Sequence, residues 1–180
     1  MRLIFQRLLL AIFGILVCGC HRPPINLEPA IVNPPAILIC NMKLQWPAGM
    51  LFTHSWISWT VDGSYFQQIE VLNDAYSEHH GYVVYDDYVS TLDAHLRRPY
   101  NEGTLVTAIY GEDAKKIIIW ILNNWQKYPY IHEYSYIGPN SNTFIQWLID
   151  NASKETGIKV RDLAPSSFGR FYLRKGHVEN

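Results

Sequence analysis

A serine at the start of an expected helix and a histidine at the start of an expected strand are the residues of this chain whose types allow covalent chemistry. Ser141 lies in the segment Gly-Pro-Asn-Ser-Asn-Thr-Phe (residues 138–144), which opens an apolar pattern typical of a helix. A helix N-terminus presents unpaired backbone N–H groups that favour developing negative charge. His54 begins a strand-like segment far upstream. If folding brings the two together, they predict acyl transfer or hydrolysis by a serine nucleophile with a histidine base.

On this hypothesis His54 accepts the proton of Ser141 and later returns a proton to the leaving group, while Glu70 orients the imidazole. Backbone N–H groups near Ser141 stabilise the oxyanion, with Asn140 or Asn142 as an additional donor and substrate contact. The alternative is structural. Ser and Asn commonly cap helices, Asn140 is a natural N-cap, and an isolated strand histidine is often held by backbone hydrogen bonds.

The hairpin that contains His54 decides whether Glu70 reaches it. Two strand-like segments, 54–61 and 64–71, flank Asp62-Gly63, which is a strong hairpin signal. A two-residue turn directs Glu70 away from the face of His54, whereas one extra loop residue brings it onto that face. The sequence leaves both registers open.

The other apolar patterns predict an α+β domain in which an antiparallel sheet packs against helices. Cys40 ends a continuous apolar run, so we expect a buried thiol rather than a nucleophile. The expected strands are 36–40, 82–85 and 105–110, and the expected helices are 90–97, 114–125 and 141–152.

Alternating tyrosines precede the Ser141 turn. Tyr128 and Tyr130 begin this stretch, which continues to Tyr136 and contains several amphipathic rings. We expect it to form a substrate-binding wall, with Tyr128 and Tyr130 as contacts, whereas most other aromatic side chains are expected in the core.

The N-terminal segment predicts export. Arg2 and Arg7 flank a short apolar run that ends at Gly19-Cys20, a pattern typical of a bacterial lipoprotein signal with lipidation at Cys20. An ordinary cleaved signal or an uncleaved anchor remains the alternative, and each exports the chain. The predicted organisation is a signal at 1–19, a lipidated and Pro-rich extended tether at 20–35, one globular domain at 36–174 and a flexible tail at 175–180.

The net charge and the spacing of histidines and cysteines limit the partners that the sequence predicts. The net charge of -1, without long runs of either sign, gives no electrostatic reason to bind nucleic acid. The seven histidines form no His-Glu-x-x-His pair and the cysteines form no Cys-x-x-Cys group, so we expect neither a metal nor another cofactor. Membrane association is expected through the lipid.

The motifs around Ser141 resemble the permuted papain-like superfamily, which includes NlpC-type peptidases and lecithin–retinol acyltransferase. In that superfamily a histidine precedes the nucleophile, whose motif is commonly Asn-Cys-x-x-Phe. Ser141 occupies the cysteine position here, and His54 matches the early histidine. More specifically, Tyr-Pro-Tyr (128–130) and Gly-Pro-Asn-Ser-Asn-Thr-Phe resemble the bacterial domain-of-unknown-function family 3750, over most of the exported domain.

This resemblance implies a permuted papain-like fold. With the export signal, it leads us to expect a lipid-anchored protein of the bacterial cell envelope. The expected activity is that of a Ser–His hydrolase or acyltransferase acting on an envelope peptide or a lipid-linked substrate. The alternative is a catalytically inactive papain-like module that binds an envelope ligand in the same groove.

Overall fold

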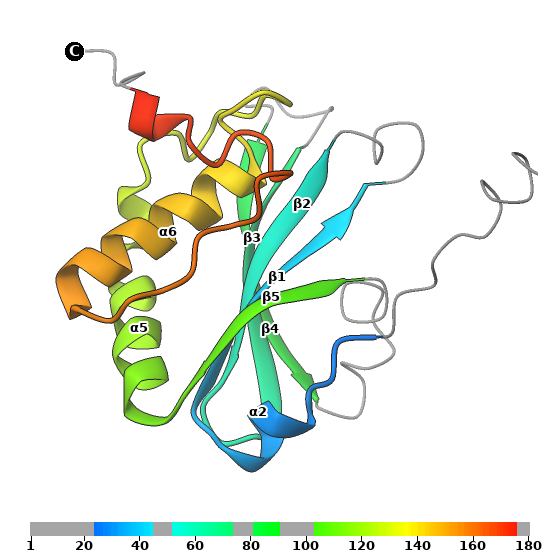
Figure 1. Ribbon diagram of the computed structural model, residues 1–180, viewed down its shortest axis with the longest axis vertical. Helices are drawn as coiled ribbons and strands as arrows, with labels where there is room; N and C mark the ends of the chain where they lie inside the picture. Colours follow the sequence, from blue (N-terminus) through cyan, green and yellow to red (C-terminus); the bar gives the residue numbers. More distant parts are fainter. Residues whose placement is uncertain (1–23, 45–51, 74–80, 91–102, 176–180) are drawn as a thin grey trace, which may run out of the picture.

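Five antiparallel strands form one sheet in the order β4-β3-β2-β1-β5 (Figure 1). The structure is a computed structural model that describes residues 24–44, 52–73, 81–90 and 103–175. Its strands are β1 (Ala36–Lys43), β2 (Thr53–Thr60), β3 (Tyr65–Asn73), β4 (Gly81–Ser90) and β5 (Thr104–Tyr110). Its helices are α2 (Glu28–Val32), α5 (Gly111–Asn124) and α6 (Ser141–Thr156), with short 3-10 turns η2 (Trp125–Lys127) and η3 (Leu173–Lys175). The predicted α+β class with an antiparallel sheet is confirmed.

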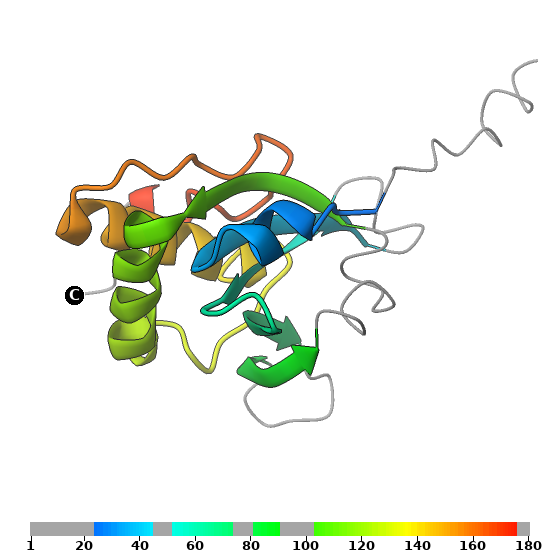
Figure 2. The same cartoon turned by 90° about the horizontal axis from the view of Figure 1, so that it is seen from below.

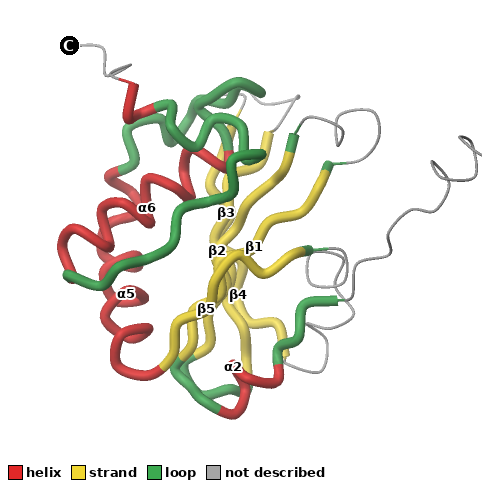
Figure 3. Tube along the Cα trace, viewed as in Figure 1, coloured by secondary structure: helices red, strands yellow, loops and turns green. Residues whose placement is uncertain are grey.

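The two faces of the sheet pack against different helices (Figures 2 and 3). Successive side chains of a strand point to opposite faces, and β1 shows this alternation. Ile37 and Ile39 join the large core formed with α5 and α6, on what we call the helix side. Leu38 and Cys40 join the cluster that contains Ala30 of α2, on the far side. The apolar run of β1 is therefore continuous because both faces are covered, and the predicted burial of Cys40 is confirmed.

The two long helices are buried to different extents. In α5 the buried residues Ala114, Ile117, Ile118 and Ile121 recur at spacings of three and four, as an amphipathic helix requires. In α6 the first three turns are almost entirely buried because the helix begins against β2 and β3. This placement brings the N-terminus of α6 to the start of β2.

The β2–β3 hairpin adopts the register that the sequence left open. Ile57 pairs with Ile69, which is the register produced by one loop residue more than a two-residue turn provides. Even-numbered residues of both strands then share a face. Glu70 consequently lies on the same face of the sheet as His54.

The segment before β1 differs from the predicted extended tether. Residues 28–32 form α2, and Ile25, Leu27 and Ala30 are buried in the far-side cluster. Pro29 lies in the first turn of α2, where its fixed φ and missing N–H are tolerated. Because three apolar side chains in this segment find a sheet face to cover, it is part of the domain rather than a linker.

Other expected elements differ in length or lie outside the described residues. The strand expected at 82–85 is the longer β4, and the helix expected at 141–152 extends to Thr156. Of the helix expected at 90–97, Ser90 belongs to β4 and the remainder is not described. The signal, Cys20 and residues 176–180 are also outside the described part. Within that part, no helix combines the length and apolar character needed to span a bilayer.

Candidate functional site

A hydrogen-bonded histidine–glutamate pair lies on the far side of the β2–β3 hairpin. His54 Nε2 donates to Oε2 of the Glu70 carboxylate, and the other carboxylate oxygen accepts a hydrogen bond of 2.8 Å from Gln68 Nε2. The side chains of His54 and Glu70 are 12% and 15% exposed. The hairpin register places all three residues on one face, so the predicted orientation of the imidazole by Glu70 has a structural basis.

The pair opens into a cavity of about 520 Å³, which we call the His54 cavity. The Trp56 ring lies nearly parallel to the imidazole, with ring centroids 6.4 Å apart and planes inclined by 18°. The cavity is lined by Met42, Leu44, His54, Trp56, Glu70, Leu72, Asn73, Tyr134 and Tyr136. Its wall is therefore largely apolar and aromatic, with a few polar groups at one place, as in many ligand sites.

Tyr134 connects this cavity to the start of α6. It lines the cavity, and its hydroxyl is hydrogen-bonded to the Ser141 side chain. Burial raises the pKa of Tyr134, and the hydrogen bond with Ser141 partly opposes this rise. Gly81 of β4 allows the Tyr134 segment to pass close to the sheet, because a Cβ at Gly81 would lie 2.8 Å from the Tyr134 Cβ.

Ser141 and His54 belong to different sides of the sheet. Ser55 donates a hydrogen bond of 2.7 Å to Asn142 Oδ1 in α6, so its side chain faces the helix side. The adjacent His54 therefore points to the far side, where Trp56 also lies. Ser141 is 1% exposed, and the hydrogen bonds among the described residues include none between Ser141 and His54. The Ser141–His54 catalytic pair stays a prediction.

The two asparagines beside Ser141 make structural contacts. Asn140 Oδ1 accepts from Thr143 N at 3.1 Å, while the Thr143 hydroxyl accepts from Asn140 N, which completes a capping box. Asn142 Nδ2 donates to the backbone oxygens of Thr53 at 2.9 Å and Phe168 at 2.8 Å. The predicted N-cap at Asn140 is confirmed, and neither asparagine lines the His54 cavity.

The tyrosine stretch divides between core and cavity. Tyr128 is 2% exposed and packs edge-on against Phe144, with ring centroids 5.0 Å apart. Tyr130 packs against Tyr172 instead. Of this stretch, Tyr134 and Tyr136 are the tyrosines that line the His54 cavity.

Several cavity residues have no distinctive sequence motif. Met42, Trp56 and Leu72 line the His54 cavity because their strands present them on its face. Side chains two residues apart along a strand share a face, so the alternation that includes His54 and Glu70 could have indicated the cavity face. It does so only when the pairing of the strands is known.

These features define an α+β protein with one antiparallel sheet and a histidine–glutamate pair facing a partly aromatic cavity. The family model described as "Protein of unknown function (DUF3750)" matches residues 37–172, and the chain belongs to this family. The match confirms the more specific of the two resemblances seen in the sequence. No curated protein and no solved structure matches the chain.

Proposed function

We propose that this chain is a lipid-anchored protein of the bacterial cell envelope that binds an envelope peptide or a lipid-linked ligand in the His54 cavity. The observation that carries the proposal is the His54–Glu70 pair opening into that cavity. The predicted signal and lipidation at Cys20 support the location.

The pair supplies directed polar recognition. Nε2 is used by the bond to Glu70, and the described hydrogen bonds of His54 use only Nε2, so Nδ1 is left for a ligand. A polar ligand group, such as a peptide amide, meets this requirement. Met42, Leu44 and Leu72 offer apolar surface for an aliphatic side chain or an acyl chain.

Binding is testable with the full-length protein in detergent micelles. Tryptophan fluorescence is followed on addition of a cell-wall stem peptide or a short-chain phospholipid, and Trp56→Phe identifies the part of the signal that comes from the one tryptophan in the cavity wall. We expect His54→Ala and Glu70→Gln to weaken binding by at least about tenfold, a loss of about 1.4 kcal/mol. Glu112→Gln is the matched control because Glu112 is an exposed carboxylate on α5. Unchanged affinity in both cavity variants would refute the binding site.

A second function, the Ser–His hydrolase or acyltransferase of papain-like type, is favoured by one observation. Tyr134 lines the His54 cavity and is hydrogen-bonded to the Ser141 hydroxyl, so one side chain separates the expected nucleophile from the cavity. Catalysis additionally needs the Ser141 oxygen within about 3 Å of a base, or one water away. This arrangement requires Ser141 to become accessible and His54 to approach it.

A serine-directed fluorophosphonate separates the two functions. If the chain is a Ser–His enzyme, the probe should label Ser141 covalently, and the labelling should disappear in both Ser141→Ala and His54→Ala. The binding module predicts no labelling together with unchanged ligand affinity in Ser141→Ala, because that side chain does not line the cavity.

A further inference from the structure

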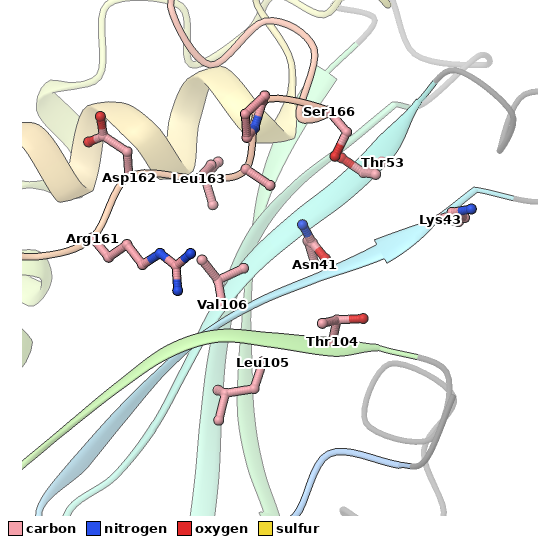
Figure 4. Close-up of a pocket in the computed structure, with 12 residues that line it drawn as sticks. Asn41, Lys43, Thr53, Thr104, Leu105, Val106, Arg161, Asp162, Leu163 and Ser166 are labelled. Atoms are coloured by element: carbon pink, nitrogen blue, oxygen red, sulfur yellow. The ribbon is translucent and has the colours of Figure 1, made fainter. Parts of the chain in front are cut away.

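A second cavity lies on the helix side of the sheet, between strands β1 and β5 and the segment 161–166 that follows α6 (Figure 4). Its volume is about 450 Å³. It shares no lining residue with the His54 cavity, because adjacent β1 and β2 residues point to opposite faces. We call it the Asn41 cavity.

Asn41 is the unusual residue of this cavity. It is 8% exposed, and the hydrogen bonds of the described residues include none to its side-chain amide. Figure 4 shows this side chain directed from β1 toward the space beneath segment 161–166. No atom of its amide is among the described side-chain atoms that are fully buried without a partner, so the amide stays open to the cavity. A bound ligand can therefore accept a hydrogen bond from it.

The charges around the cavity favour an anion. Lys43 and Arg161 both line it, from β1 and from the segment after α6. The acidic residue of the lining is Asp162, and its carboxylate already accepts hydrogen bonds from Arg174 and Gln146. In Figure 4 the Asp162 carboxylate points away from the cavity, whereas the Arg161 guanidinium extends toward the sheet.

The remaining lining determines the size and character of the ligand. Thr53 and Ser166 contribute hydroxyls, and Val106, Leu163 and Pro165 contribute apolar surface. We propose that the Asn41 cavity binds a small organic carboxylate with a short apolar substituent. The carboxylate pairs with the Arg161 guanidinium and accepts a hydrogen bond from the Asn41 amide, while the substituent contacts the apolar wall. This inference is independent of the proposed function, because it uses other residues on the other face.

The test compares a carboxylate with its neutral analogue on the full-length protein. By calorimetry we expect N-acetyl-leucine to bind at least about tenfold more tightly than N-acetyl-leucinamide. Arg161→Gln is expected to remove most of this preference. Lys159→Gln is the matched control, because Lys159 is an exposed cation just before the segment 161–166 that does not line the cavity. Equal binding of the acid and the amide, or tighter binding of inorganic phosphate, would overturn the proposal.

A second variant separates binding from structure. Asn41→Leu keeps the size of the side chain and removes its amide, so we expect N-acetyl-leucine binding to be lost while the thermal midpoint of the free protein stays unchanged or rises. If Asn41→Leu instead lowers the thermal midpoint and Arg161→Gln still binds N-acetyl-leucine, Asn41 has a structural role and not a binding role. Ligand binding in the His54 cavity should be unaffected by Arg161→Gln.

Discussion

Two adjacent side chains at the start of α6 have different tasks. Asn140 satisfies backbone donors of the first turn through its capping box with Thr143. The Ser141 hydroxyl is therefore not needed for capping and is hydrogen-bonded to Tyr134 instead. The sequence placed both residues at the helix start but did not show which one caps, since serine and asparagine serve almost equally well there.

The cap contributes measurably to stability. We expect Asn140→Ala to lower the free energy of unfolding by about 1 kcal/mol, because the Thr143 N–H loses its partner. Asn140→Ser should recover most of this loss, since serine also caps. Guanidinium unfolding followed by circular dichroism measures the difference. Equal losses in the two variants would show that the contact of the Asn140 amide with the Tyr136 carbonyl matters more.

The Tyr134–Ser141 hydrogen bond predicts a non-additive pair of substitutions. Tyr134→Phe leaves the buried Ser141 hydroxyl without its partner and is expected to cost about 1–2 kcal/mol of unfolding free energy. Adding Ser141→Ala removes the orphaned hydroxyl, so the double variant should regain part of that loss. A double-mutant cycle of unfolding free energies measures the coupling. Additive losses would contradict a direct hydrogen bond.

The Cys40 thiol is expected to be inert while the protein is folded. It is fully buried, and desolvation raises its pKa well above that of a free thiol, so little thiolate forms near neutral pH. Iodoacetamide at about pH 8 should leave the peptide containing Cys40 unmodified, as read by mass spectrometry, until denaturant is added. Rapid alkylation without denaturant would show that β1 opens readily.

At the scale of elements, the sequence predicted the helices and strands that are recognisable from their own local pattern. The period of Ile117, Ile118 and Ile121 identified α5, and the β2–β3 hairpin was found from its turn residues. The side of the sheet that His54 faces was not predictable in this way. It depends on how β2 contacts α6 through Ser55, a contact between residues distant in the sequence.

The segment before β1 gives the sharpest correction at this scale. Its prolines suggested an extended tether, yet Leu27 is completely buried against the far side of the sheet. Pro29 starts a helix as readily as it extends a linker, so composition alone does not separate the two.

Because this segment is buried, shortening one of its apolar side chains is expected to destabilise the fold strongly. Leu27→Ala should lower the free energy of unfolding by about 2–5 kcal/mol, because it leaves a cavity between α2 and the sheet. Val32→Ala in the same helix is the control, since Val32 is 67% exposed and should change the value by less than about 0.5 kcal/mol. Thermal and chemical unfolding of both variants measures this. Equal, small effects would restore the tether interpretation.

For the molecule as a whole, the sheet separates two cavities. The His54 cavity needs Tyr134 and Tyr136 from the loop before α6, and the Asn41 cavity needs the segment 161–166 after it. Each therefore forms only when parts of the chain that are distant in sequence pack against the strands. This explains why the sequence indicated His54 and Glu70 as a pair but did not reveal either cavity.

The segment after α6 is held in place by an ion network. Arg174, in η3, donates to Asp150 in α6 with Nε–Oδ2 at 2.8 Å and to Asp162 in the segment itself. Gln146 donates to the same two carboxylates at 2.9 Å each. The network thus joins α6 to Asp162 in the segment that covers the Asn41 cavity and to η3 beyond it.

This network predicts a pH-dependent stability. The hydrogen bond from Arg174 holds the pKa of Asp162 below its ordinary value of 3.8, although burial acts in the opposite direction. Because the folded form binds fewer protons than the unfolded chain, this contribution is fully present above the ordinary carboxylate pKa. It is lost as the pH falls from there through the lower pKa of the folded form.

Arg174→Gln removes the network while leaving both carboxylates. The Arg174 side chain is 42% exposed, so we expect a screened loss of about 0.5–1 kcal/mol in unfolding free energy at about pH 7. The difference from the wild type should shrink as the pH falls below the ordinary carboxylate pKa and through the lowered pKa of Asp162. Lys159→Gln should show no such trend. A difference that stays constant over this pH range would attribute the effect of Arg174 to its packing over the Phe171 ring, 4.8 Å from the ring centroid, rather than to its ion pairs.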